Sequence, residues 1–225
     1  MSAPEVTSLG NTVPGARALA EAVLNNPSIQ ELNKSLWIFS VVETAHLLFL
    51  TTLGGATLVL ALRVLGVALL DVTPAEVERA TRPWLRWATL GGIASGIFMS
   101  IATVLTLIDN SSFVVKLLAL GAAVTLGFAL SGRLRGGSRG LQYALATVGL
   151  SLLSLGIWLF ISTRILVFGS ILLGTVAGLF LLLVLITRAR GPVQDKGDRF
   201  AQLLAIGTVV AWTTVILGGR WIGFS

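Results

Sequence analysis

The chain has no cysteine, a single histidine and few charged residues: Asp, Glu, Lys and Arg make up 12% of its 225 residues. A soluble domain carries about a quarter charged residues, so this chain lacks the polar surface of a soluble enzyme. Without cysteine it has no thiol nucleophile, and it cannot be a secreted scaffold stabilised by disulfides. With one histidine, a single chain cannot supply two axial histidines to one haem.

What the chain does contain is apolar sequence, with 55% hydrophobic residues and a mean hydropathy of +0.90. These residues form blocks of the roughly 18 or more residues that a helix needs to cross a bilayer. The sequence therefore predicts an all-α fold, a polytopic membrane helix bundle with about six transmembrane helices. The predicted spans are Leu36–Leu62, Trp84–Ile108, Phe113–Leu130, Leu141–Ile161, Ile165–Ile186 and Ala201–Trp221.

The cations are unevenly divided between the two sides of these spans. Eleven of the 16 Lys and Arg residues lie in or beside three loops, 63–83, 131–140 and 187–200. The positive-inside rule assigns these loops to the cytoplasm and both termini to the periplasm of a bacterial inner membrane. The sequence pI of 11.1 follows from this asymmetry, so we expect no nucleic-acid partner.

The predicted organisation has two parts. Residues 1–34 form a periplasmic N-terminal segment in which Ala16–Leu24 has the apolar spacing of a short interfacial helix. Residues 35–225 form the six-span membrane domain. Within it, Thr73–Glu76 is a capping box with Pro at the first helical position, which predicts a short cytoplasmic helix. The Gly- and Arg-rich segment Ser131–Gly140 predicts a flexible inner loop.

Ionisable residues inside a span are costly, so they are the natural site candidates. Glu43 and His46 are three residues apart in the first span and therefore share one helical face. Counted from Trp37 at about 1.5 Å per residue, they lie roughly 9 and 13 Å deep. Gly54 and Thr57 continue the same face with small side chains, so another helix or a flat ligand can approach closely.

Two interpretations of this pair remain open. In the first, Glu43 orients His46, whose free ring nitrogen meets a metal, a haem iron or a quinone oxygen. In the second, the two side chains form a neutral hydrogen-bonded pair that locks the bundle together. Under the first interpretation His46 is the metal ligand.

Three cations also belong to the outer half of the membrane: Lys116, Arg164 and Arg220. Each has a plain alternative role, because Lys116 can snorkel to headgroups or pair with Glu43 or Asp109, and the arginines can anchor headgroups. If the spans pack around the first one, a polar pocket opens toward the outside and suits an anionic ligand such as haem with its propionates. The predicted cofactor-binding residues are His46, Glu43, Lys116, Arg164 and Arg220.

Two further features predict helix packing. The pair Gly92 and Gly96 allows close helix contact, and Trp212, which lies in mid-span, is more often a core residue than a stacking platform.

The first span carries a resemblance. The run from Trp37 to His46, with Glu43 and Thr44 inside it, resembles an uncharacterised family of bacterial polytopic membrane proteins. More loosely, a histidine in the first span and a Phe-x-x-Lys in a later one are similar to copper-resistance membrane proteins of the CopD type and to HemJ-type proteins. That similarity implies haem or copper as the cofactor. The family pattern continues at Gly54–Gly55, Leu62–Gly66, Pro83–Trp84, Ser95–Gly96, Phe113 with Lys116, and Gly219–Ile222.

Three functions follow as expectations. The first is an integral membrane binding protein, or a subunit of a membrane redox complex, that holds haem or copper at the periplasmic side around Glu43 and His46. The second is a purely structural membrane subunit or assembly factor without a ligand. The third is a small-solute transporter, which ranks last because no paired broken helices are present. No residue is assigned a catalytic role, and the expected partners are the lipid bilayer and other membrane subunits or further copies of the chain.

Overall fold

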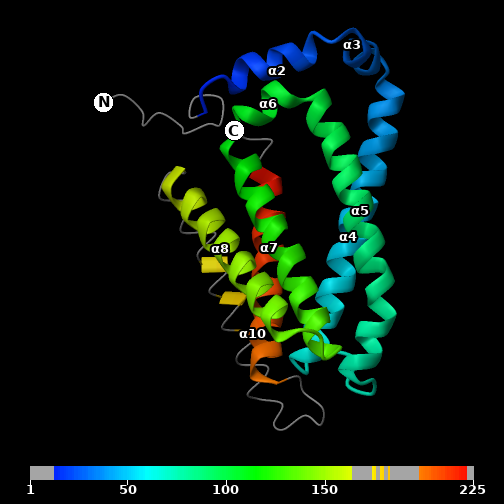
Figure 1. The fold of residues 1–225 in the computed structure, drawn as a ribbon, viewed down its shortest axis with the longest axis vertical. Coiled ribbons are helices and arrows are strands. Elements are labelled where there is room, and N and C mark those ends of the chain that lie inside the picture. Colours follow the sequence, from blue (N-terminus) through cyan, green and yellow to red (C-terminus); the bar gives the residue numbers. More distant parts are fainter. Residues whose placement is uncertain (1–12, 164–173, 176–177, 180–181, 183–197, 222–225) are drawn as a thin grey trace.

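The computed structural model describes residues 13–163, 174–175, 178–179, 182 and 198–221, and these residues form helices and no strands (Figure 1). The predicted all-α membrane fold is confirmed, and the described part contains five helices long and apolar enough to span a membrane. The predicted span Ile165–Ile186 lies almost entirely outside the described residues. The five helices are α4 (Leu36–Val64), α5 (Pro74–Ala102), α7 (Ser111–Leu134), α8 (Arg139–Thr163) and α10 (Arg199–Trp221).

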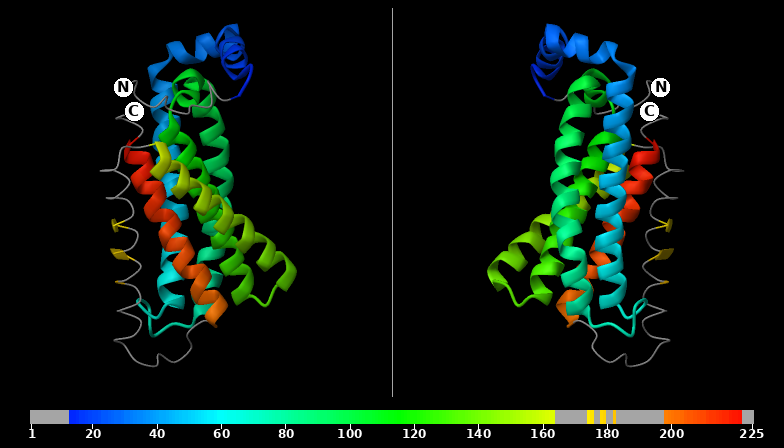
Figure 2. Two further views of the ribbon diagram at one scale, coloured as in Figure 1. Left: turned by 90° about the vertical axis from the view of Figure 1, so that its left-hand side faces the viewer. Right: turned by 90° about the vertical axis from the view of Figure 1, so that its right-hand side faces the viewer.

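The long helices run side by side along the length of the molecule (Figure 2). Helix α4 packs on α5, α7 packs on α8, and α10 joins the two pairs by contacting both α4 and α7. The buried face of α7 includes four alanines with no exposed surface, among them Ala119, Ala122 and Ala123. Small side chains of this kind let helix backbones approach closely when lipid gives no hydrophobic drive for helix association.

Short helices cross one end of the bundle, which we call the α2 end (Figure 1). They are α2 (Ala16–Leu24), α3 (Pro27–Lys34) and α6 (Val104–Ile108). The prediction of a short helix at Ala16–Leu24 is confirmed. An ion pair of 2.6 Å between Arg17 and Asp109 ties α2 to the end of α6.

Helix α5 differs from the prediction at both ends. The capping box is present, with the Thr73 hydroxyl accepting from the Glu76 amide. The helix it starts does not stop before the membrane, however, but continues through Pro83 to Ala102. Buried residues on both sides of Pro83 give this helix tertiary contacts that outweigh the one hydrogen bond a proline removes. The prediction of a separate short helix at this position is therefore wrong. The prediction that this span reaches Ile108 is also wrong, because α5 ends at Ala102 and Val104–Ile108 forms the separate helix α6.

The opposite end, the Arg-rich end, is defined by Arg63, Arg82, Arg133 and Arg135. Two of its loops are shorter than predicted. Residues 65–73 connect α4 to α5, and Ser131–Gly140 belongs mostly to α7 and α8, which leaves residues 135–138 between them. A positive φ of 70° at Gly136 makes this turn. The side-chain amide of Gln142 donates to the Gly137 carbonyl at 2.7 Å and holds it in place. Arg63 is buried, and its Nε donates to the carbonyl of Val72 in the loop between α4 and α5.

Candidate functional site

A cavity of about 790 Å³ lies among α4, α5, α7 and α8 in the half of the bundle next to α2 and α6. Its volume falls within the range of small-molecule sites, which are mostly apolar with a few placed polar groups. Most of the lining is Leu, Ile, Val, Phe, Met and Gly. The polar side chains that line it are His46, Thr89, Ser100, Thr103, Lys116 and Thr125.

The ring of His46 is hydrogen-bonded to α5. Its Nδ1 lies 2.9 Å from the Ser95 hydroxyl, and the ring also makes a hydrogen bond with the backbone of Gly92. The Ser95 hydroxyl donates to the Gly91 carbonyl at 2.6 Å. In the tautomer with the proton on Nδ1, this hydroxyl accepts from His46 and the lone pair of the neutral ring lies on Nε2. A histidine held this way through one ring nitrogen is prepared to bind a metal or a donor through the other.

Glycines on α5 bring the two helices close enough for this bond. A Cβ atom at Gly96 would lie 3.2 Å from Cε1 of His46, and one at Gly91 would lie 2.4 Å from the Phe49 ring. The latter distance is a collision, so Gly91 cannot carry a side chain unless Phe49 moves. The predicted close contact at this glycine motif is confirmed, and its partner is α4.

Lys116 reaches the cavity from α7, opposite the helix that carries His46. The structure does not bring it together with Asp109, which pairs with Arg17, nor with Glu43. Lys116 makes no ion pair with any described carboxylate. A half-buried ammonium group therefore lines a mainly apolar cavity without a counter-ion from the described part of the chain.

Glu43 lies elsewhere. It is exposed, does not line the cavity, and forms no hydrogen bond with His46. The hydrogen bond predicted from Glu43 comes instead from Ser95, which the sequence marks as part of the family pattern but not as a site residue. A three-residue spacing only places two side chains on adjoining parts of a helix surface, and here the neighbouring helix lies on the His46 side.

The remaining predicted cations contribute no described contact. Arg164 lies outside the described residues, and Arg220 lies in the last turn of α10 with its side chain outside the description. Of the three predicted cations, Lys116 alone is seen at the cavity. In the part of the chain that the structure describes, no group of three or more His, Asp or Glu side chains could hold a metal ion. Among the residues that line the cavity, His46 is the one His, Asp or Glu side chain that could bind a metal.

Trp212 is a core residue, as predicted. Its side chain is 5% exposed, its Nε1 donates to the Thr57 hydroxyl at 2.7 Å, and its ring lies against Gly54. The small-residue face of α4 at Gly54 and Thr57 therefore receives a tryptophan of α10, and no space is left there for a flat ligand.

Comparison with known proteins identifies the family. The sequence pattern of the Family of unknown function (DUF6644) matches residues 37–170, more than half of the chain. The chain belongs to this family. Neither the curated proteins nor the solved structures contain a match, and these comparisons give no similarity to CopD-type or HemJ-type proteins.

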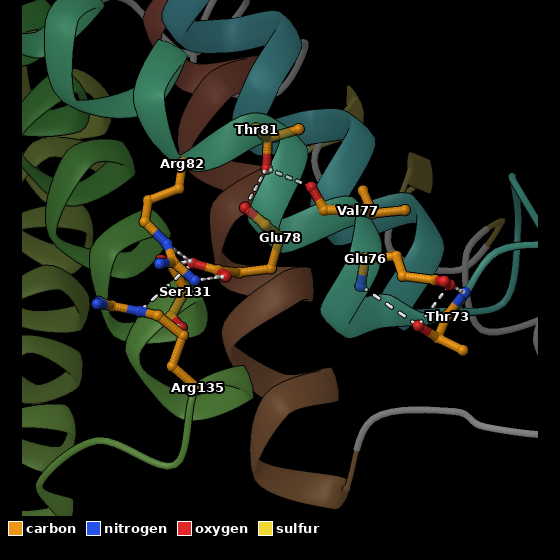
Figure 3. Close-up of polar contacts among 8 residues, drawn as sticks. All are labelled: Thr73, Glu76, Val77, Glu78, Thr81, Arg82, Ser131 and Arg135. Atoms are coloured by element: carbon orange, nitrogen blue, oxygen red, sulfur yellow. Dashed lines mark hydrogen bonds and ion pairs between the residues drawn. The ribbon is translucent and has the colours of Figure 1, made fainter.

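The stretch that matches DUF6644 contains His46, Ser95 and Lys116, and also a buried charge cluster at the Arg-rich end (Figure 3). The side chain of Glu78 is 2% exposed and accepts hydrogen bonds from Ser131 at 2.6 Å and Arg82 Nε at 2.9 Å. Arg135 completes the cluster with an ion pair of 3.4 Å. Sequence reasoning missed Glu78 because it placed the residue in a short cytoplasmic helix outside the bundle. The spacing of Glu78 and Arg82, one helical turn apart after a capping box, is the signal that could have found it.

Proposed function

We propose that the protein is an integral membrane binding protein, alone or as a subunit of a membrane redox complex, that holds haem in the cavity between α4, α5 and α7. The observation that carries this proposal is the bond from His46 Nδ1–H to Ser95 at the cavity wall. It leaves the Nε2 lone pair for a ligand, in the arrangement that metal-binding histidines adopt when their other nitrogen donates to the protein.

The rest of the cavity suits the same ligand. Its apolar walls fit a porphyrin face, and Gly92 and Gly96 on α5 leave room beside His46. Lys116 offers a positive charge to a propionate, which would be its missing counter-ion. When bound, haem would supply one-electron chemistry whose potential depends on its axial ligand and on burial. Copper fits less well, because the cavity lining offers it two suitable donors, His46 and the thioether of Met99, and no further histidine or thiolate.

The proposed membrane orientation places the Arg-rich end in the cytoplasm of a bacterial inner membrane and both termini in the periplasm. The clustering of Arg63, Arg82, Arg133 and Arg135 at one end of the bundle supports it, and the cavity then lies in the outer half. Because the chain has no cysteine, single cysteines at Ser28 and Ser138 can test it. A membrane-impermeant maleimide added to intact cells should label the first position and not the second.

One observation favours a second function. The hydrogen bond between His46 and Ser95 joins α4 to α5, so the pair could act only as a packing contact in a structural subunit. In that case Ser95→Ala and His46→Ala would weaken the bundle equally, and neither residue would affect ligand binding.

Titration with hemin in detergent separates the two functions. We expect wild type to bind hemin with a Soret shift, His46→Gln to lose it, and Ser95→Ala to bind roughly 10- to 100-fold more weakly, as expected when the residue behind a metal ligand is removed. Lys116→Met tests whether the cation contributes to hemin binding. Its matched control is Lys34→Met, since Lys34 lies on the surface beside Glu31. Equal spectra for wild type and His46→Gln would contradict haem ligation at His46.

A further inference from the structure

The cavity beside His46 is covered at both ends of the bundle. At the Arg-rich end, α5 and α7 are joined where Ser131 of α7 donates to Glu78 of α5 at 2.6 Å. At the α2 end, the short helix α6 connects α5 to α7 (Figure 1), and the ion pair of 2.6 Å between Arg17 and Asp109 ties α2 to its end. Apolar side chains of these two short helices line the cavity: Val23, Val104 and Leu107. Protein thus covers the cavity toward the water on both sides of the membrane.

The side of the cavity between α5 and α7 is different. Helix α5 packs mainly on α4, and α7 packs mainly on α8 and α10, so α5 and α7 contact each other little. Four large apolar side chains of α5 and α7 line the cavity and are also exposed on the surface: Ile93 at 56%, Ile97 at 57%, Ile101 at 38% and Leu117 at 48%. A side chain that does both lies at the edge of an opening. The cavity therefore opens sideways between α5 and α7, and we call these four residues the rim of the lateral opening.

The lateral opening faces the hydrocarbon layer of the membrane. Its rim lies within the membrane-spanning stretches Pro74–Ala102 and Ser111–Leu134. The surface of α5 beside the rim, toward the Arg-rich end, is also apolar, with Trp87 and Leu90 both more than half exposed. Isoleucine and leucine are among the side chains that a bilayer core accommodates best. A ligand that passes the rim therefore comes from the lipid, where it must first dissolve.

The groups behind the rim restrict this ligand further. Lys116 precedes the rim residue Leu117 and lines the cavity, without a counter-ion among the described carboxylates. Most of the other lining side chains are apolar, and they include Leu50 and Leu53 of α4. An apolar molecule with an anionic group fits both features, because its body contacts the walls and its anion pairs with the ammonium group.

We propose that the cavity takes its ligand from the lipid phase through the lateral opening, and that this ligand is a membrane-dissolved amphiphile with an apolar body and an anionic group. The inference rests on the proposed function of the site, since haem with its propionates belongs to this class. It concerns the route into the cavity, however, whereas the proposed function concerns the ligand that His46 binds. A fatty acid belongs to the same class and can report the route without haem.

Photolabelling from the lipid phase tests the route. The protein in phosphatidylcholine vesicles receives a long-chain fatty acid with a diazirine in its acyl chain, and a flash follows either within seconds or after equilibration. Leu53 reports entry, because it lines the cavity but is 2% exposed. Peptide mass spectrometry should find label at Leu53 in wild type. Ile97→Trp combined with Leu117→Trp narrows the opening, so we expect it to reduce the early label by roughly tenfold, as a higher entry barrier requires.

Leu90→Trp is the matched control, since Leu90 is exposed on α5 but does not line the cavity. It should leave the label at Leu53 unchanged. Thermal unfolding in detergent checks the folding of the Trp pair, and Ile97→Trp alone repeats the comparison if the pair is unstable. Label at exposed residues such as Trp87 without label at Leu53 would overturn the proposal, as would equal early label in the Trp variants and in the control.

Hemin dissolved in the vesicles separates the route from the proposed function. We expect the Soret band of bound hemin to appear roughly tenfold more slowly in the Trp pair than in Leu90→Trp, and to reach the same amplitude. Label at Leu53 without any Soret change in wild type would support the route and contradict haem as the ligand. A Soret change at equal rates in both variants would support haem and overturn the lateral route.

Discussion

The Arg-rich end and the half next to α2 differ in the pairing of the charges discussed above. At the Arg-rich end, the buried Glu78 carboxylate has three partners, Arg82, Ser131 and Arg135, and Arg133 pairs with Asp198. In the half next to α2, Lys116 and Glu43 lie in membrane-spanning helices without an ion-pair partner among the described residues. There α4 and α5 approach closely at glycines, and His46 of α4 is hydrogen-bonded to Ser95 of α5.

The difference separates fold from function. A buried charge is tolerated when it is fully paired and hydrogen-bonded, and removal of its partner is then strongly destabilising. A charge that the fold leaves unpaired adds nothing to stability and is explained better by something that binds it. We therefore attribute the Glu78 cluster to folding and Lys116 to a ligand.

The largest loss of stability should come from a substitution at the Arg-rich end. Glu78→Leu removes the carboxylate that accepts from the buried Ser131 and from Arg82, and we expect the loss of these hydrogen bonds to lower the free energy of unfolding by about 2–4 kcal/mol. Helix content followed during SDS titration measures this. Glu31→Leu, which removes an exposed pair with Lys34, should cost at most about 1 kcal/mol. Equal losses in the two variants would show that the cluster is not what stabilises this end.

The next effect tests packing in the other half. Gly91→Ala forces the Phe49 ring away from α5, because the new Cβ would lie 2.4 Å from it, and overpacking of this kind costs about 1–3 kcal/mol. At the adjacent Gly92 the nearest Phe49 atom lies 3.9 Å away, so Gly92→Ala should be neutral or slightly stabilising. Thermal unfolding of both variants in one detergent provides the comparison, and a larger loss for Gly92→Ala would contradict the packing.

Lys116→Met should not lower the stability of the ligand-free protein, in contrast to Glu78→Leu. It removes an ammonium group that has no described counter-ion, so we expect the ligand-free protein to be as stable as wild type, or more stable by up to about 1 kcal/mol. Hemin affinity should fall by roughly tenfold, equivalent to one lost charge contact of about 1.4 kcal/mol. A loss of stability larger than that of Lys34→Met would place Lys116 among the folding residues.

The smallest effect concerns pH. The Arg133 guanidinium holds the pKa of the Asp198 carboxyl below its ordinary value, helped by the Ala201 amide. The folded pKa is thus lower than the unfolded one, so the pair stabilises the protein above pH ~4 and loses its effect as the pH falls through the folded pKa. Because Asp198 is partly exposed, Asp198→Asn should cost at most about 1 kcal/mol at pH 7. That difference should shrink as the pH falls below about 4, and a difference that grows over this range would contradict the assignment.

The sequence predicted the helices and the importance of His46, because hydropathy and rarity are properties of the residues themselves. It did not predict the partner of His46, because the choice between Glu43 and Ser95 depends on which side of α4 the next helix lies. It also missed the Glu78 cluster, since a proline that seemed to open a span in fact lies within one continuous helix. Trp212 was placed correctly in the core, but its bond to Thr57 requires the register of α10 against α4.

The central claim is that His46 and Lys116 serve a ligand rather than the fold. The most direct measurement is the thermal stability of wild type, His46→Gln and Ser95→Ala in detergent, each with and without hemin. The account predicts similar unfolding temperatures without hemin, a clear rise for wild type on hemin addition, a smaller rise for Ser95→Ala and none for His46→Gln. Lower unfolding temperatures for both variants without hemin, together with no rise for wild type, would contradict it and assign the pair to helix packing.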